Sequence, residues 1–174
     1  MPKPRFRVAA AIADKAILEN RAVGMTVGAH RLAQLPPDRG GRQHLKIMQL
    51  LAAVDGDGAN SLSEVLVATV PRIRRGMTAV VVTPSLDRTW VKPLSTLKAR
   101  GVACVAVTFD RAAFTQWGRS VDARTRGLTP PEPDPEEQSE SKQQLRALRH
   151  ALAEFDIDLF VVTPGKALGE ILAG

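Results

Sequence analysis

Three short apolar runs rich in β-branched residues constrain the fold more than any other feature of this sequence. They are residues 77–83 (MTAVVVT), 102–109 (VACVAVTF) and 157–163 (IDLFVVT). Nearly unbroken runs of this kind are typical of parallel strands that are covered on both faces. Parallel strands need helical crossovers, and segments with helical periodicity lie between these runs. The sequence therefore predicts a three-layer α/β fold in which a mostly parallel sheet is flanked by helices.

The spacing of apolar residues also predicts where the helices lie. They are expected over residues 8–20, 42–54, 61–73, 89–100 and 141–155, with a short helix after Pro164-Gly165. Ser61-Leu-Ser-Glu64 has the pattern of a capping box, and Pro71 should kink or end the helix that it opens. Gly101 directly follows a predicted helix, where a left-handed residue is common.

The N-terminal part is expected to contain a hairpin. Residues 21–28 alternate like a strand, and Gly24 within them suggests a bulge or close packing. A second strand from about His30 to Leu35 could return beside the first, and Pro36-Pro37 should stop it.

One segment breaks the pattern of strands and helices. Residues 118–140 contain Thr129-Pro-Pro-Glu-Pro-Asp-Pro135 and several acidic residues, which cannot bury a core. We expect a mobile loop there, with a polyproline ligand as the alternative. A chain of 174 residues suits one domain, so the expectation is a single domain over residues 1–174 that carries this loop.

Composition limits the classes of function. The single cysteine, Cys104, lies in an apolar run and is expected to be a buried structural thiol. The net charge is +6, but the basic residues are scattered and aromatic residues make up only 4%, so nucleic-acid binding is not expected. An acidic protein or anionic lipid headgroups fit a basic surface at least as well. No apolar run reaches about 18 residues and no signal peptide is recognisable, so we expect a cytoplasmic chain without a transmembrane segment.

Catalytic motifs are incomplete. Gly165-Lys166 follows a strand as in a phosphate-binding loop, but Phe160 stands where the first glycine of that loop is required. There is no Gly-x-Ser-x-Gly elbow, and the histidines lack the spacing of a helical zinc site. The histidines are His30, His44 and His150. The sequence therefore predicts no enzyme activity, no catalytic residues and no cofactor.

Ligands of parallel sheets bind beyond the carboxyl ends of the strands. Polar residues at or near these ends belong to the candidate partner-binding surface, namely Thr83, Ser85, Asp87 and Asp110. Asn60 and Ser61 are included in this surface because of a family resemblance.

Several segments, in order, resemble the C-terminal half of the bacterial family called domain of unknown function 58. They are residues 20–28 (NRAVGMTVG), 35–43 (LPPDRGGRQ), 61–66 (SLSEVL), 74–83 (RRGMTAVVVT) and 148–157 (LRHALAEFDI). That family is similar to von Willebrand factor A domains, and its members often accompany MoxR-type AAA+ ATPases. The resemblance implies a non-catalytic protein–protein interaction module, an adaptor that works with such an ATPase.

The same resemblance implies that the chain is truncated at its N-terminus. Full-length members usually have an N-terminal hydrophobic hairpin and then a central first strand, and neither has a counterpart here. Membrane association would depend on that missing region, which would place a full-length protein on the cytoplasmic face of the membrane.

The resemblance also bears on metal binding. True A domains bind a cation through a first-strand Asp-x-Ser-x-Ser, a threonine and an aspartate. The first element has no counterpart, Asn60-Ser61 fall at the threonine, and Pro84 falls at the aspartate. Only Ser61, Ser85 and Asp87 could offer side-chain oxygens, so no metal is expected. The alternative interpretation is a Rossmann-like enzyme domain that binds a small molecule or nucleotide in the same crevice.

Overall fold

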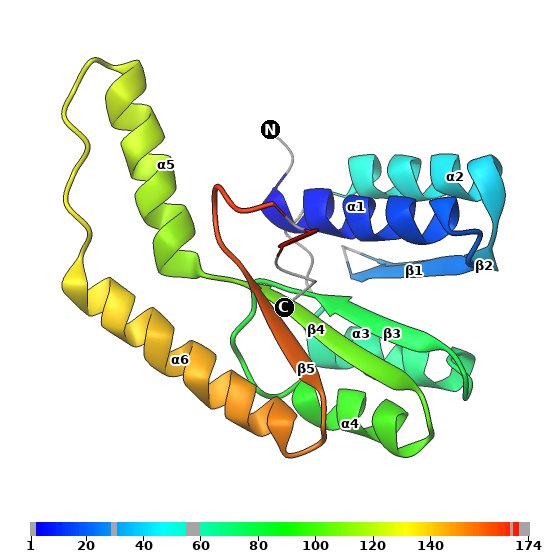
Figure 1. The fold of residues 1–174 in the computed structure, drawn as a ribbon. Helices are drawn as coiled ribbons and strands as arrows, with labels where there is room; N and C mark the ends of the chain where they lie inside the picture. Colours follow the sequence, from blue (N-terminus) through cyan, green and yellow to red (C-terminus); the bar gives the residue numbers. More distant parts are fainter. Residues whose placement is uncertain (1–2, 29–30, 55–59, 168, 171–174) are drawn as a thin grey trace. The chain divides into compact units, whose positions relative to one another are not determined.

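The computed structural model describes residues 3–28, 31–54, 60–167 and 169–170 (Figure 1). The chain divides into two compact units, residues 1–74 and 75–174. We call them the N-terminal unit and the C-terminal unit and describe each by itself. The expected single domain over residues 1–174 stays a prediction.

The N-terminal unit packs helices on a β-hairpin. Its elements are α1 (Pro4–Leu18), β1 (Val23–Gly28), β2 (Leu32–Asp38), α2 (Gly40–Ala53), α3 (Leu62–Thr69) and the short 3₁₀ helix η1 (Val70–Arg72). Strands β1 and β2 are antiparallel, and α1 and α2 lie side by side over the hairpin in Figure 1. Ala13, Ile47 and Leu51 form the buried centre, against which apolar side chains of the hairpin pack. The unit therefore has a core of its own.

The second strand of the hairpin differs from the prediction. The expected end at Pro36-Pro37 is wrong, because β2 continues through both prolines to Asp38, which pairs with Val23. Proline is tolerated on an edge strand or at a bulge, and the register does shift between Val23 and Met25. The expected bulge and close packing at Gly24 are confirmed, since a Cβ there would lie 2.9 Å from the Leu35 carbonyl oxygen. The expected strand start at His30 lies outside the described residues.

Signals for helix ends in the N-terminal unit are confirmed. The Glu64 amide donates to the Ser61 hydroxyl at 3.3 Å, and the Ser61 amide donates to the Glu64 carboxylate at 2.7 Å. This reciprocal pair is the predicted capping box at the start of α3. Pro71 ends the regular helix as expected, because the chain passes into η1 there.

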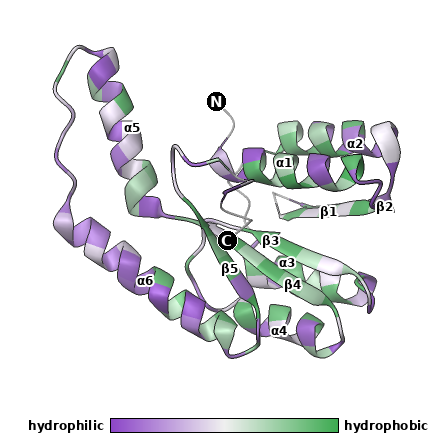
Figure 2. Ribbon diagram, viewed as in Figure 1, coloured by the Kyte–Doolittle hydropathy of each residue, from purple (hydrophilic) through white to green (hydrophobic). Residues whose placement is uncertain are grey.

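The C-terminal unit contains the predicted parallel sheet. Its elements are β3 (Thr78–Val82), α4 (Val91–Ala99), β4 (Ala103–Phe109), α5 (Arg111–Thr125), α6 (Pro135–Ala153) and β5 (Asp158–Val162). The strand order is β3-β4-β5, and both neighbouring pairs are parallel. The α/β class with a parallel sheet flanked by helices is thus confirmed. The strands are mainly hydrophobic in Figure 2, as the β-branched runs predict.

Both crossovers of this sheet step in the same direction, from β3 to β4 and from β4 to β5. Right-handed crossovers that step in one direction place their helices on the same face. That face is covered by α4, since the Cys104 thiol lies 3.8 Å from the Leu94 carbonyl oxygen. Trp90, Leu94 and Leu97 are fully buried. On the other face Val80, in the edge strand β3, remains 41% exposed.

The expected mobile loop over residues 118–140 is largely helical. Helix α5 runs to Thr125 and α6 begins at Pro135, so only residues 126–134 are irregular. The reason is the start of α6: Asp134 accepts hydrogen bonds from the amides of Glu136 and Glu137, and proline is well suited to the first helical turn. An ion pair of 3.0 Å between Arg119 and Glu137 joins the two helices across the connection. In the described part of the chain, no helix has the length and apolar character needed to span a membrane.

Candidate functional site

Thr83, Ser85 and Asp87 lie in the segment that follows β3, and a series of local hydrogen bonds holds them. The Ser85 amide donates to the Thr83 hydroxyl at 3.1 Å, and the Asp87 amide donates to the Ser85 hydroxyl at 3.3 Å. Thr83 is 5% exposed, and its amide donates to the Val107 carbonyl of the neighbouring strand. Each side chain therefore shapes the turn after the strand, and Asp87 is the most exposed of the three.

Thr89 fixes the Asp87 carboxylate. The Thr89 hydroxyl donates to one carboxylate oxygen at 2.6 Å, and the Thr89 amide donates to the other at 3.2 Å. These two bonds, the hydroxyl first, lower the pKa of Asp87 below its ordinary value because they favour the ionised form. Asp87 thus presents a fixed negative charge in the segment after β3.

Asp110 directly follows β4, the parallel neighbour of β3, so it lies at the same carboxyl end of the sheet as Thr83. Its carboxylate accepts a hydrogen bond from the Ala113 amide at 3.0 Å and caps α5. The same oxygen accepts a bond of 3.4 Å from the Ser141 hydroxyl of α6. Asp110 therefore connects β4, α5 and α6 within the C-terminal unit.

Asn60 and Ser61 belong to the N-terminal unit, and Ser61 caps α3. The structure thus places four of the six predicted residues at the carboxyl end of the C-terminal sheet and two in the other unit. Among the described residues, no three histidine, cysteine, aspartate or glutamate side chains are grouped as metal ligands would be.

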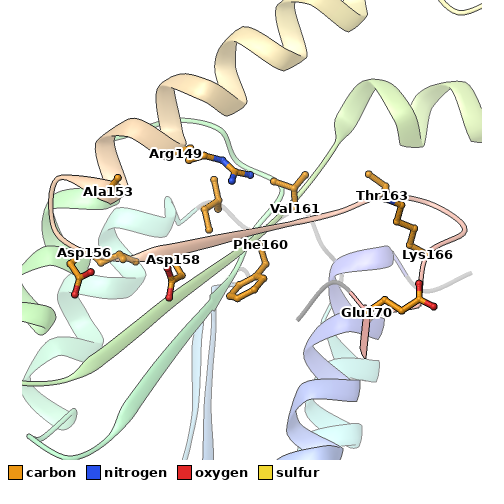
Figure 3. Close-up of a pocket in the computed structure, with 11 residues that line it drawn as sticks. Arg149, Ala153, Asp156, Asp158, Phe160, Val161, Thr163, Lys166 and Glu170 are labelled. Atoms are coloured by element: carbon orange, nitrogen blue, oxygen red, sulfur yellow. The ribbon is translucent and has the colours of Figure 1, made fainter. Parts of the chain in front are cut away.

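A groove that the sequence analysis missed runs along β5, the other edge strand (Figure 3). It has a volume of about 750 Å³ and lies between the C-terminal part of α6 and the segment after β5. Arg149 and Ala153 line it from α6, and Lys166 and Glu170 line it from beyond the strand. All four side chains are exposed, so charged groups border an accessible strand.

The backbone of β5 forms the floor of this groove. Val162 accepts a hydrogen bond from the Asp110 amide, so its backbone groups point toward β4. Backbone directions alternate along a strand, and the amides and carbonyls of Leu159 and Val161 therefore point away from β4. Among the described strands, β5 pairs only with β4. The groove thus offers an extended chain strand-type donors and acceptors that pair with no other described strand.

Two sequence signals could have located the groove. Residues 157–163 form one of only three predicted parallel strands, and a three-stranded open sheet has two edge strands. Arg149 flanks the buried stripe of Leu148 and Leu152 on α6, and its exposed side chain can therefore border that edge.

No family model, curated protein or solved structure matches this chain.

Proposed function

We propose that this chain is a non-catalytic protein–protein interaction module. The observation that carries the proposal is the groove along β5, where an open strand edge lies between charged side chains. Binding of an extended segment beside such an edge is a common mode of peptide recognition. The backbone groups of Leu159 and Val161 would supply affinity, and the side chains at the rim would supply specificity.

The charge of the chain indicates what kind of protein would bind. Residues 1–74 contain 11 Lys and Arg against 6 Asp and Glu, while residues 75–174 contain 13 against 12. The net charge of +6 therefore comes mainly from the N-terminal unit. A positive field of this kind accelerates association with an acidic partner. We infer that the partner is an acidic protein and that its extended segment carries both signs of charge, because Arg149 and Lys166 line the groove together with Asp156, Asp158 and Glu170.

The finer assignment rests on the resemblance of the sequence. We propose a von Willebrand A-like domain that acts in the cytoplasm as an adaptor for a MoxR-type AAA+ ATPase. The parallel β3-β4-β5 sheet flanked by helices is compatible with a Rossmann-like layout.

The test is a binding assay of groove variants against a MoxR-type ATPase and against other acidic proteins. Arg149→Glu reverses a charge that borders the groove, and Val161→Pro removes an amide that points away from β4. Arg146→Glu is the matched control, because Arg146 is exposed on the same helix but does not line the groove. Partner binding should fall at least tenfold for the two groove variants and stay within twofold for the control. Equal binding by all three would refute the groove as the docking site.

A second candidate function has one observation in its favour. The buried hydroxyls of Thr108 and Thr163, near the carboxyl ends of β4 and β5, have no hydrogen-bond partner in the described structure. A Rossmann-like sheet binds its small molecule or nucleotide beyond the carboxyl ends of its strands, which is where these two hydroxyls lie. Thermal shift assays with nucleotides, phosphate and divalent ions distinguish the two functions, because a bound ligand raises the Tm.

A further inference from the structure

The outer edge of β3 has the composition of an interior strand. Residues 78–82 (TAVVV) contain no charge and no proline, although natural edge strands usually carry one or the other. Among the described strands, β3 pairs only with β4. Thr78 is exposed, and Val80 is 41% exposed. An uncharged, β-branched edge of this kind favours pairing with a further strand.

The register of the sheet shows which backbone groups are available. The Ala103 amide donates to the Met77 carbonyl, and the Thr83 amide donates to the Val107 carbonyl. Residues 77 and 83 therefore point toward β4, and by alternation Thr78, Val80 and Val82 point away from it. These three residues can exchange hydrogen bonds with a strand on the open side.

We infer that β3 pairs in an antiparallel arrangement with β3 of a second copy of this chain. A twofold axis at Val80 would set Val80 opposite its own copy and Thr78 opposite Val82. Such β-branched cross-strand pairs are favourable. The two three-stranded sheets would join into one six-stranded sheet, with an isologous interface.

Charge at the ends of β3 selects this orientation. Arg74 and Arg75 precede the strand, and Asp87, whose carboxylate accepts two hydrogen bonds from Thr89, follows it with Arg88 beside it. Antiparallel pairing at Val80 brings Arg75 of one copy beside the turn that carries Asp87 of the other, twice in the dimer. Parallel pairing would instead bring Arg75 near Arg75 and Asp87 near Asp87. Complementary charges thus favour the twofold arrangement.

This self-association is separate from the proposed function, since it uses β3 whereas partner docking uses β5 at the opposite edge of the sheet. Groove variants such as Arg149→Glu should leave the dimer intact. Variants of β3 should leave binding of the partner intact. The two proposals can therefore fail independently.

The experiment measures the mass of the full chain by light scattering and sedimentation from about 1 to about 300 μM, a range that detects a micromolar Kd. The wild type should change from monomer to dimer as the concentration rises. Val80→Lys should weaken dimerisation at least tenfold, because a charge then lies at the centre of the interface. Val67→Lys is the matched control, since Val67 is 60% exposed on α3 and the same substitution there should leave the dimer unchanged.

A charge exchange tests the register. Arg75→Glu and Asp87→Lys should each weaken the dimer, and the double variant should restore it. If Val80→Lys fails to fold, as judged by tryptophan fluorescence, Thr78→Lys and the concentration dependence of hydrogen exchange at the Val80 amide decide instead. A wild type that is monomeric throughout this range overturns the inference, and so does a dimer that Val80→Lys and Thr78→Lys do not weaken.

Discussion

The edge strands of the two units differ in whether they contain proline. In the N-terminal hairpin, β2 carries Pro36 and Pro37, which have no amide to offer to another strand. The buried Gln43 side chain also donates to the Val23 carbonyl at 2.7 Å and to the Pro36 carbonyl at 2.9 Å. In the C-terminal unit, β3 and β5 carry no proline and each pairs with β4 alone. Among the described strands, the edge strand β2 of one unit contains proline, whereas the two edge strands of the other unit, β3 and β5, contain none.

The units also differ in what stabilises them. A single buried glutamine links both strands of the hairpin, whereas the C-terminal sheet depends on apolar side chains packed against the face that α4 covers. The following substitutions test this difference, in order of decreasing effect.

Leu94→Ala should cause the largest loss of stability. Leu94 is fully buried on α4, and truncation of such a leucine costs about 3 kcal/mol of unfolding free energy. Denaturant titration followed by tryptophan fluorescence measures the loss, because both tryptophans, Trp90 and Trp117, lie in the C-terminal unit. Leu128→Ala, at a 61% exposed position, should change stability by less than about 0.5 kcal/mol. Similar effects of the two substitutions would contradict packing as the main source of stability there.

Gln43→Leu should lower the stability of the N-terminal unit by about 2 kcal/mol, because two carbonyl oxygens lose their donor. Far-UV circular dichroism detects unfolding of this unit, which contains no tryptophan. An unchanged unfolding midpoint would show that the hairpin does not depend on this link between its strands.

Ser61→Ala should cost about 1 kcal/mol, since it removes the side chain that caps α3. Circular dichroism during thermal unfolding measures the change in Tm. Ser63→Ala, within the same helix, is the control and should have a smaller effect. An equal effect of both would mean that the capping box contributes little.

Thr89→Val should affect one titration and little else. Without the Thr89 hydroxyl, the pKa of Asp87 should rise toward its ordinary value. Since the folded pKa is lowered, the stabilisation from this carboxylate is present above the unfolded pKa and is lost as the pH falls through the folded pKa. In the variant this stabilisation should be smaller, and its loss should be complete at a higher pH. A carbon-13 NMR titration of the Asp87 carboxyl measures the shift, and an unchanged pKa would contradict the assigned cause.

Much of the fold was predictable because periodicity and local signals determine it. The β-branched runs identified all three parallel strands, and Ser61 with Glu64 identified the start of α3. The extent of β2 was missed because proline normally ends a strand, and only the bulge near Gly24 makes room for it. The start of α6 was missed because the acidic and proline-rich composition hid an Asp-Pro-Glu-Glu signal over residues 134–137.

The candidate site was less predictable. The predicted ends of the strands correctly located Thr83 and Asp110 at the carboxyl end of the sheet. Their engagement in turns and caps was not predictable, because it depends on neighbours such as Ser141, which comes from a helix 31 positions away. The groove along β5 was missed for a similar reason: it depends on where α6 and the segment after β5 lie, which the sequence pattern does not specify.

The reaction rate of the Cys104 thiol reports how often the C-terminal unit opens. Cys104 is the chain's one cysteine, it lies in the middle strand of the C-terminal sheet under α4, and its burial raises the pKa of the thiol. A thiol reagent can therefore modify the native chain only when α4 lifts from the sheet or the sheet itself opens. The rate of thiol labelling therefore measures how often these openings occur, with no engineered probe. A strand added at β3 or β5 should lower the rate at which Cys104 is labelled.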